Sequence, residues 1–240
     1  MPASVDPAPR ALARTRATTS LIALNAIAFA AALALGMDPL APDGRQLLAL
    51  GGNFLPLTRF EPWRLLSALF LHAGALHLVF NMWALHDLGR IAERLFGTAR
   101  FVLIYLLGGL LGSLTSLFFS ASEAVAVGAS GAVFAAAGAI LAAATSRSMP
   151  RSLATQLRRA ILILVGYALM LGIVLPDIDN AAHIGGLCAG YLIGRTLIAL
   201  PASGSHPTLR WRGVLIAVLA TAALAGVGLR LLSGAGALVS

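Results

Sequence analysis

The chain is 240 residues long, of which 59% are hydrophobic and only 11% are charged. Its mean hydropathy of +0.89 lies far from the balance of soluble domains, which excludes an ordinary soluble enzyme. All 17 basic residues are arginine, but they form no patch with interleaved aromatic residues, so we expect no nucleic-acid partner. The composition therefore predicts an all-α, polytopic membrane protein.

The N-terminal part of the chain predicts a cytoplasmic segment, residues 1–17, followed by a membrane helix over Thr18–Gly36. That apolar run can cross a bilayer and is long for the apolar part of a cleaved signal peptide, so we expect an uncleaved helix. An organellar transit segment stays open as an alternative, because such segments are also rich in arginine and poor in acids. Residues 37–63, punctuated by Pro and Gly, then predict a structured external loop.

Five further helices complete the predicted membrane core, and the one that begins at Ser130 is unusually short. Their expected bounds are Ala73–Phe96, Arg100–Phe119, Ser130–Thr145, Ala160–Leu175 and Ala181–Leu200, with a polar connection over residues 147–159. After a segment rich in Pro, Ser and Gly, the apolar run Arg212–Leu232 predicts a seventh transmembrane helix. The expected architecture is a six-helix core over residues 18–200, with a linker and a last helix over residues 201–240.

The arginines are distributed unevenly between the two sides of the membrane that this topology defines. With a cytoplasmic N-terminus, only four of the 17 fall outside, namely Arg45, Arg59, Arg64 and Arg230. This bias follows the positive-inside rule, so the basic pI near 11.4 reports topology and not a polyanionic partner. We expect an integral protein of a bacterial inner membrane whose N-terminus is cytoplasmic.

Several polar side chains fall within the predicted spans, where a charged group costs about 3 kcal/mol at a helix centre. His77 and Asn81 share one helical face because they are four residues apart, and His72 lies near the outer end of the same helix. His183 precedes Gly186 by three residues, on a face of small residues that a neighbouring backbone can approach closely. Each of these side chains, taken alone, is also consistent with a group that only hydrogen-bonds helices together.

A serine flanked by glycines begins the short helix, in the segment Gly128-Ala129-Ser130-Gly131. Free backbone N–H groups and the positive end of the helix dipole can stabilise an oxyanion there. The pattern alone is weak, because glycine and serine are ordinary packing residues of membrane helices. Combined with a histidine on a second helix and two hydrogen-bond donors on a third, it supplies a nucleophile, a base and an oxyanion hole.

The order and spacing of these residues resemble the rhomboid family of intramembrane serine proteases. The motifs that carry the resemblance are Trp63-Arg64, His72, His77-x-x-x-Asn81, Glu93-Arg94-x-x-Gly97, Gly128-x-Ser130-Gly131 and Ala182-His183-x-x-Gly186, after which Gly190 continues the small-residue face. The match spans about residues 63–194. It implies a structural role for the motif residues outside the catalytic group, including the loop that holds Trp63 and Arg64.

The resemblance also implies the chemistry of the site. Ser130 would be the nucleophile and His183 its base. Asn81, His77 and the Ser130 backbone N–H would surround the oxyanion. Phe134 stands where the family usually carries a tyrosine stacked on the catalytic histidine, and its ring should preserve that stacking. We expect neither a cofactor nor a metal, because rhomboid-like chemistry needs none and the histidines lack acidic or cysteine partners at metal-ligand spacing.

The expected activity is hydrolysis of peptide bonds within or next to transmembrane segments of membrane proteins, after the helix Ala160–Leu175 and the turn around Pro176 move aside. A rhomboid-like protein that binds transmembrane clients without cleaving them is the alternative, although such proteins usually lack the serine or the histidine. Asp179 could complete a Ser-His-Asp triad, but acids in an external turn are usually only solvated. Cys188, the lone cysteine, is expected to be a buried structural thiol. The oligomeric state is not predicted.

Overall fold

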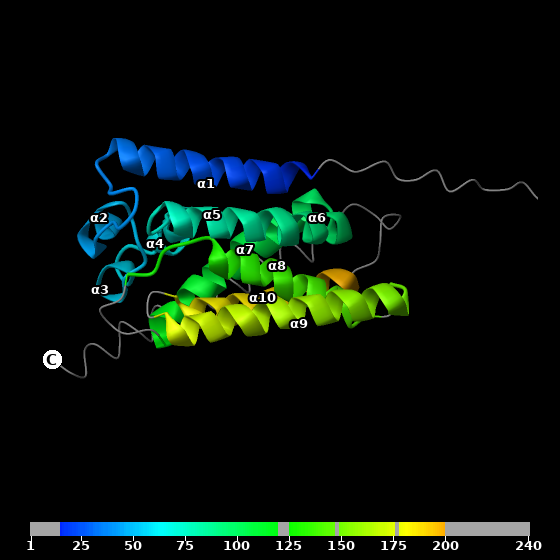
Figure 1. Ribbon diagram of the computed structural model, residues 1–240. Coiled ribbons are helices and arrows are strands. Elements are labelled where there is room, and N and C mark those ends of the chain that lie inside the picture. Colours follow the sequence, from blue (N-terminus) through cyan, green and yellow to red (C-terminus); the bar gives the residue numbers. More distant parts are fainter. Residues whose placement is uncertain (1–14, 120–124, 147–148, 176–177, 200–240) are drawn as a thin grey trace, which may run out of the picture.

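The computed structural model describes residues 15–119, 125–146, 149–175 and 178–199, and it builds them from helices joined by short connections (Figure 1). Within these ranges no extended strand forms, and Asn53 and Ala126 make an isolated antiparallel bridge. The prediction of an all-α fold is therefore confirmed for this part of the chain. The predicted seventh helix, Arg212–Leu232, lies outside the described residues.

The helices follow one another along the chain as α1 (Arg16–Ala34), α2 (Gly44–Ala49), α3 (Leu55–Thr58), α4 (Arg64–Ser67), η1 (Ala68–Phe70), α5 (Ala75–Ala84), η2 (Leu85–Gly89), α6 (Arg90–Phe96), α7 (Thr98–Phe119), α8 (Ser130–Ala144), α9 (Arg151–Val174) and α10 (Asn180–Ala199). The segments α5, η2 and α6 form one continuous helix, in which η2 is a π-helical turn. The expected external loop contains the short helices α2 and α3.

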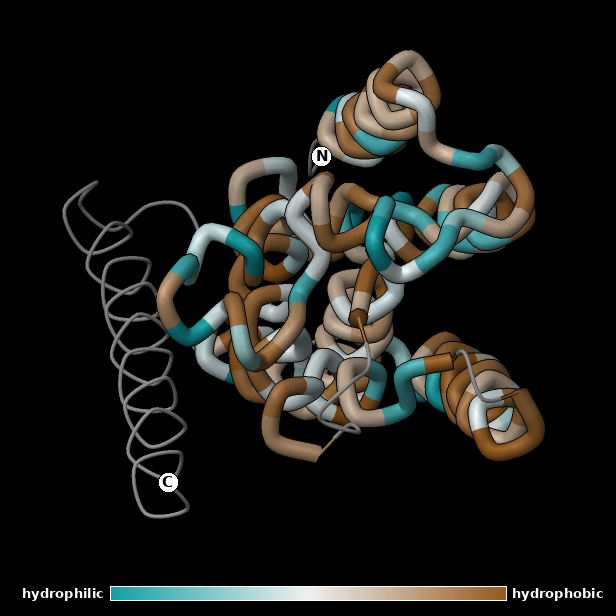
Figure 2. Tube along the Cα trace, turned by 90° about the vertical axis from the view of Figure 1, so that its left-hand side faces the viewer, coloured by the Kyte–Doolittle hydropathy of each residue, from teal (hydrophilic) through white to brown (hydrophobic). Residues whose placement is uncertain are grey.

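Several helices have the length and composition of membrane spans. In the described part of the chain, α1, α7 and α9 are each long and apolar enough to cross a bilayer. The pair Arg64–Phe70 and Ala75–Phe96, bent by 90° at its break, can form a further span. Much of the helical chain is hydrophobic, as the brown segments in Figure 2 show, and many large hydrophobic side chains are exposed, which suits contact with lipid. The protein is therefore a polytopic membrane protein.

The start of α9 differs from the prediction. This helix begins at Arg151, not at Ala160, so the polar connection predicted over residues 147–159 is wrong from Arg151 onward. The apolar run begins near Ala160, but Pro150 at the N-cap sets the helix start, and no glycine or proline interrupts the next four turns. Hydropathy marks where a helix becomes apolar, whereas local propensity marks where it begins.

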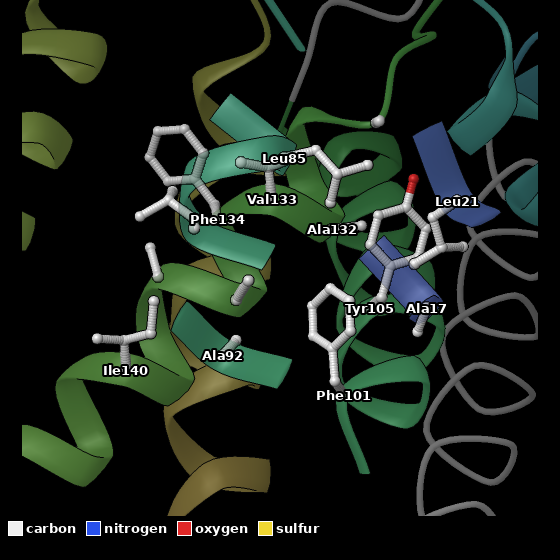
Figure 3. Close-up of a cluster of buried hydrophobic side chains, with 14 of the residues drawn as sticks. Ala17, Leu21, Leu85, Ala92, Phe101, Tyr105, Ala132, Val133, Phe134 and Ile140 are labelled. Carbon is white, nitrogen blue, oxygen red and sulfur yellow. The ribbon is translucent and has the colours of Figure 1, made fainter. Parts of the chain in front are cut away.

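The core is built around α8, which lies between α1 on one side and α9 on the other in Figure 1. Only Ser130 and Leu141 among the α8 residues are not fully buried. On one side, aromatic and aliphatic side chains from α1, η2, α6 and α7 pack against α8, as the labelled residues in Figure 3 show. This packing encloses α8 and holds its first residue at a defined position.

Small residues bring α10 against α8 on the other side. A Cβ atom on Gly186 would lie 2.1 Å from the carbonyl oxygen of Gly131, and one on Gly190 would lie 1.9 Å from that of Ala135. These positions accept only glycine, because real side chains cannot approach a backbone so closely. The predicted small-residue face of α10 therefore faces α8 and places His183 beside it.

Candidate active site

The approach to Ser130 depends on a glycine. Gly128 has φ +125, a conformation that L side chains rarely adopt, and a Cβ atom there would lie 2.8 Å from Cε1 of His77. Its N–H donates a hydrogen bond of 2.8 Å to the carbonyl of Ala68. Gly128 therefore brings the chain past the His77 ring and lets α8 begin at Ser130, as predicted.

Asn53 holds the same segment from the other side. It exchanges two backbone hydrogen bonds with Ala126, of 3.0 and 2.9 Å. Its buried side chain donates to the Ser113 carbonyl on α7 at 2.9 Å and accepts from the Thr58 hydroxyl at 3.0 Å. The prediction missed Asn53, although an asparagine in an otherwise apolar Gly-Gly-Asn-Phe segment is a recognisable signal for such a contact.

His183 is buried on α10, and its ring lies flat on the ring of Phe134. The ring centroids are 4.1 Å apart and the planes differ by only 5°. Ser130 and Phe134 are four residues apart on α8, so they share one helical face. The His183 ring therefore lies within about one helical turn of Ser130.

The His77 ring presents a donor toward the start of α8. Its Nδ1 accepts a hydrogen bond of 3.2 Å from the Ala73 N–H, so a neutral ring carries its proton on Nε2. A Cβ atom on Gly128 would lie 2.9 Å from this Nε2, which places the donor against the segment that leads into Ser130. His72 is buried beside His77, with the two rings edge-on and 5.3 Å between their centroids.

Asn81 lies one turn beyond His77 and is buried. Its Nδ2 donates one hydrogen bond, of 2.9 Å, to the His77 carbonyl in its own helix. An amide nitrogen carries two protons, so this contact leaves a second N–H for another acceptor.

A cavity lies beside Ser130, and polar residues form part of its mostly apolar lining. Ser113 and Ser116 of α7 and Asp179 before α10 line it together with Ser130. The Ser116 hydroxyl donates a hydrogen bond to Oδ2 of Asp179. The two serines were missed by the prediction, because a serine within a membrane helix most often bonds to its own backbone and gives no sign of facing a cavity.

Asp179 does not form a triad with His183. Its Oδ1 accepts the Ala182 N–H at 2.9 Å, and its other oxygen accepts the Ser116 hydroxyl. Nδ1 of His183 is buried and has no hydrogen-bond partner in the described ranges. The His183 ring is therefore held by stacking on Phe134 and not by a hydrogen bond to a carboxylate.

Arg64 organises the first loop. It is buried, and its Nη1 donates to the carbonyls of Leu48 at 2.8 Å and Gly52 at 3.3 Å, while its Nε pairs with Glu61. The guanidinium lies over the ring of Trp63, with 4.8 Å from Cζ to the ring centroid. All these contacts are within the loop, and none reaches the cavity beside Ser130.

Glu93 lies at the opposite end of α5–α6 and caps α1. Its carboxylate accepts the N–H groups of Ala17 at 3.0 Å and Thr18 at 2.9 Å, as well as the Thr18 hydroxyl at 2.8 Å. A negative charge at a helix N-terminus is favourable. Arg94 beside it is exposed, and Gly97 ends α6 with φ +83.

Cys188 is exposed on α10, so the expectation of a buried thiol is wrong. Gly186 and Gly190 face α8, and Cys188 lies two residues from each of them, on the opposite side of the helix.

The fold and the site together define a polytopic helical membrane protein with a candidate serine–histidine pair at the start of a buried short helix. The family model of the rhomboid domain matches residues 59–200, which is more than half of the chain. The chain therefore belongs to the rhomboid family.

Named relatives agree with this assignment. The chain is 40% identical over 162 residues to Rhomboid protease GluP of Bacillus subtilis (strain 168), covering 67% of this chain and 31% of the relative. It is 41% identical over 170 residues to RHOMBOID-like protein 5 of Arabidopsis thaliana, which covers 70% of this chain and 54% of that relative. It is also 41% identical over 145 residues to RHOMBOID-like protein 6, mitochondrial, of the same plant, which covers 60% of this chain and 46% of that relative. The chain thus spans about a third to a half of these relatives.

Proposed function

We propose that this protein is an intramembrane serine endopeptidase that hydrolyses peptide bonds within or next to transmembrane segments of membrane proteins. The observation that carries the proposal is the stacking of His183 on Phe134, one turn along α8 from Ser130. Such a base would lie close to a hydroxyl at a helix start, beside a cavity that Ser130 and Asp179 help to line.

In the proposed mechanism His183 is neutral and accepts the proton of the Ser130 hydroxyl as its oxygen bonds to the substrate carbonyl carbon. The C–N bond then breaks, and His183 returns the proton to the leaving amine. A water molecule repeats the sequence on the acyl-enzyme: His183 takes its proton, the hydroxide adds to the carbonyl, and Ser130 leaves with the proton restored.

The negative oxygen of each tetrahedral intermediate needs donors that are already in position. We assign this task to the Ser130 backbone N–H, to Nε2–H of His77 and to the second amide N–H of Asn81. The proximity of His77 Nε2 to Gly128 supports the assignment, as does the start of α8 at Ser130, since a helix start presents unpaired N–H groups.

Substrate helices are proposed to enter by displacement of α9. The limited burial of this helix supports the idea, because only Ile161 and Val165 among its residues are buried. The predicted turn around Pro176 lies outside the described residues. The proposed location is a bacterial inner membrane with a cytoplasmic N-terminus, supported by the distribution of the arginines.

A fluorophosphonate probe tests the proposal, because it reacts covalently with an activated serine. The detergent-solubilised wild type should be labelled, whereas Ser130→Ala and His183→Ala should not. Equal labelling of all three proteins, or an unlabelled but folded wild type, would instead favour a rhomboid-like protein that binds transmembrane clients without cleaving them.

A further inference from the structure

We propose that Asp179 is a positioning residue for His183, and that it acts by tying the first turn of α10 to α7. The inference rests on the proposed function, since it concerns how the base is held. Asp179 makes no hydrogen bond to the His183 ring, so apart from the direct effect of its charge on the ring it can act through the helix start.

The first link is a helix cap. Oδ1 of Asp179 accepts the Ala182 N–H at 2.9 Å, and its backbone carbonyl accepts the His183 N–H at 3.1 Å. The first bond satisfies an N–H group that a helix start leaves without a helical partner, whereas the second is the first ordinary i to i−4 bond of α10 and needs no aspartate side chain. The Asp179 side chain therefore holds the backbone of Ala182, the residue directly before His183.

The second link reaches the neighbouring helix. Oδ2 of Asp179 accepts the hydroxyl of Ser116 on α7, and both side chains line the cavity beside Ser130. One turn earlier on α7, a Cβ atom on Gly112 would lie only 2.9 Å from the Ala182 carbonyl, so the two helices are already in close contact there. Asp179 thus bridges α7 and α10 at the level of the site.

The ring of His183 depends on this bridge because little else orients it. Its Nδ1 has no partner in the part of the chain that is described, whereas the base of a triad is held through that atom. Stacking on Phe134 fixes the plane of the ring but leaves it free to slide along that plane. A shift of the α10 backbone would therefore move the base relative to Ser130, and about 1 Å of misplacement can cost about a hundredfold in rate.

The test uses the full-length protein and steady-state cleavage of a single-pass transmembrane reporter in proteoliposomes. Asp179→Ala should lower kcat about 10- to 100-fold with little change in KM, because the base is misplaced while substrate binding is not. Asp179→Asn keeps an acceptor for Ala182 and can donate to Ser116, so it should restore kcat to within about threefold of wild type. Ser116→Ala removes only the link to α7 and should give an intermediate loss.

Glu93→Gln is the matched control, because it weakens a carboxylate cap of the same kind at α1, away from the cavity. It should lower thermal stability and leave kcat per folded molecule unchanged. Where Asp179→Ala does not fold, the Asp179→Asn and Ser116→Ala variants carry the test.

Three results would overturn the positioning role. The first is a wild-type kcat in Asp179→Ala. The second is an equal loss of kcat in Asp179→Asn and Asp179→Ala, which would show that the charge is what matters. The third is a wild-type kcat in Ser116→Ala. The rate of fluorophosphonate labelling should fall in parallel with kcat. Wild type and Ser130→Ala are measured in the same experiment. If the proposed protease activity itself is wrong, the wild type will neither react with the fluorophosphonate nor cleave the reporter, which distinguishes that failure from a failure of the positioning role.

Discussion

Two regions of the molecule are built in opposite ways. In the region where α7, α8 and α10 meet, glycines bring backbones into contact, and nearly every residue of α8 is buried. In α9, only Ile161 and Val165 are buried, and large side chains such as Tyr167 and Ile173 are exposed. A hydrogen bond of 3.0 Å from Asn180 to the Leu169 carbonyl links α9 to the start of α10.

The difference separates two requirements of the proposed reaction. A serine and its base must keep their geometry within a fraction of an ångström, which suits helices locked by backbone contact. A transmembrane substrate must reach them from the lipid, which suits a helix that can leave without breaking the core. We therefore expect changes in the glycine-packed region to alter chemistry or stability, and changes in α9 to alter substrate access.

The largest effect is expected from loss of the base. His183→Ala should reduce cleavage of a transmembrane reporter by about ten thousandfold, because members of a nucleophile–base pair act as a unit. Cleavage kinetics in proteoliposomes measure the effect, and thermal stability of the variant checks its folding. Residual activity within tenfold of wild type would remove His183 from the proposed mechanism.

Locking α9 tests the other half of the comparison. Cysteines placed at Phe80 on α5 and Tyr167 on α9, both exposed, are treated with bis-maleimides of increasing length in a Cys188→Ser background until the two helices are linked. Cleavage of the transmembrane reporter should fall to the activity that the remaining unlinked molecules account for. The small fluorophosphonate should still label Ser130 in the linked molecules.

The same cysteine variant without the bis-maleimide is the control for this experiment. Full cleavage activity in a completely linked sample would refute entry beside α9.

Substituting one glycine in each region compares how tightly the two regions are packed. In Gly186→Ala the new Cβ would meet the Gly131 backbone at 2.1 Å, so stability should fall by about 1–3 kcal/mol. In Gly166→Ala on α9 nothing lies within 4 Å, so the better helix propensity of alanine should raise stability by about 0.5–1 kcal/mol. Denaturant unfolding in mild detergent measures both, and equal effects would contradict the difference in packing.

The smallest effect concerns the stacked ring. Phe134→Leu removes a ring contact worth about 0.5–1.5 kcal/mol, so kcat should fall about two- to tenfold. Phe134→Tyr keeps the ring and should retain activity, which makes it the matched control. If both variants lose activity equally, stacking does not explain the orientation of His183.

Sequence reasoning identified the helix that starts at Ser130 and the small-residue face of α10, because both depend on local signals: a glycine-flanked serine and glycines four residues apart. It misplaced the start of α9 and the exposure of Cys188. The start of α9 is polar and gives no hydropathy signal, and the exposure of Cys188 depends on which side of α10 faces α8.

The contacts of Asn53 with Ala126 and of Ser116 with Asp179 join residues more than 60 positions apart. Such long-range contacts depend on how the helices are arranged in space, which periodicity along one helix does not specify.

Whether Ser130 cleaves peptide bonds in membrane-embedded substrates can be measured most directly by mass spectrometry of a single-pass reporter reconstituted with the purified protein. The wild type should cut at a defined bond within or next to the transmembrane segment, and Ser130→Ala should leave the reporter intact. Identical cleavage by both proteins, or an intact reporter with a folded wild type that resists fluorophosphonate labelling, would contradict this role of Ser130.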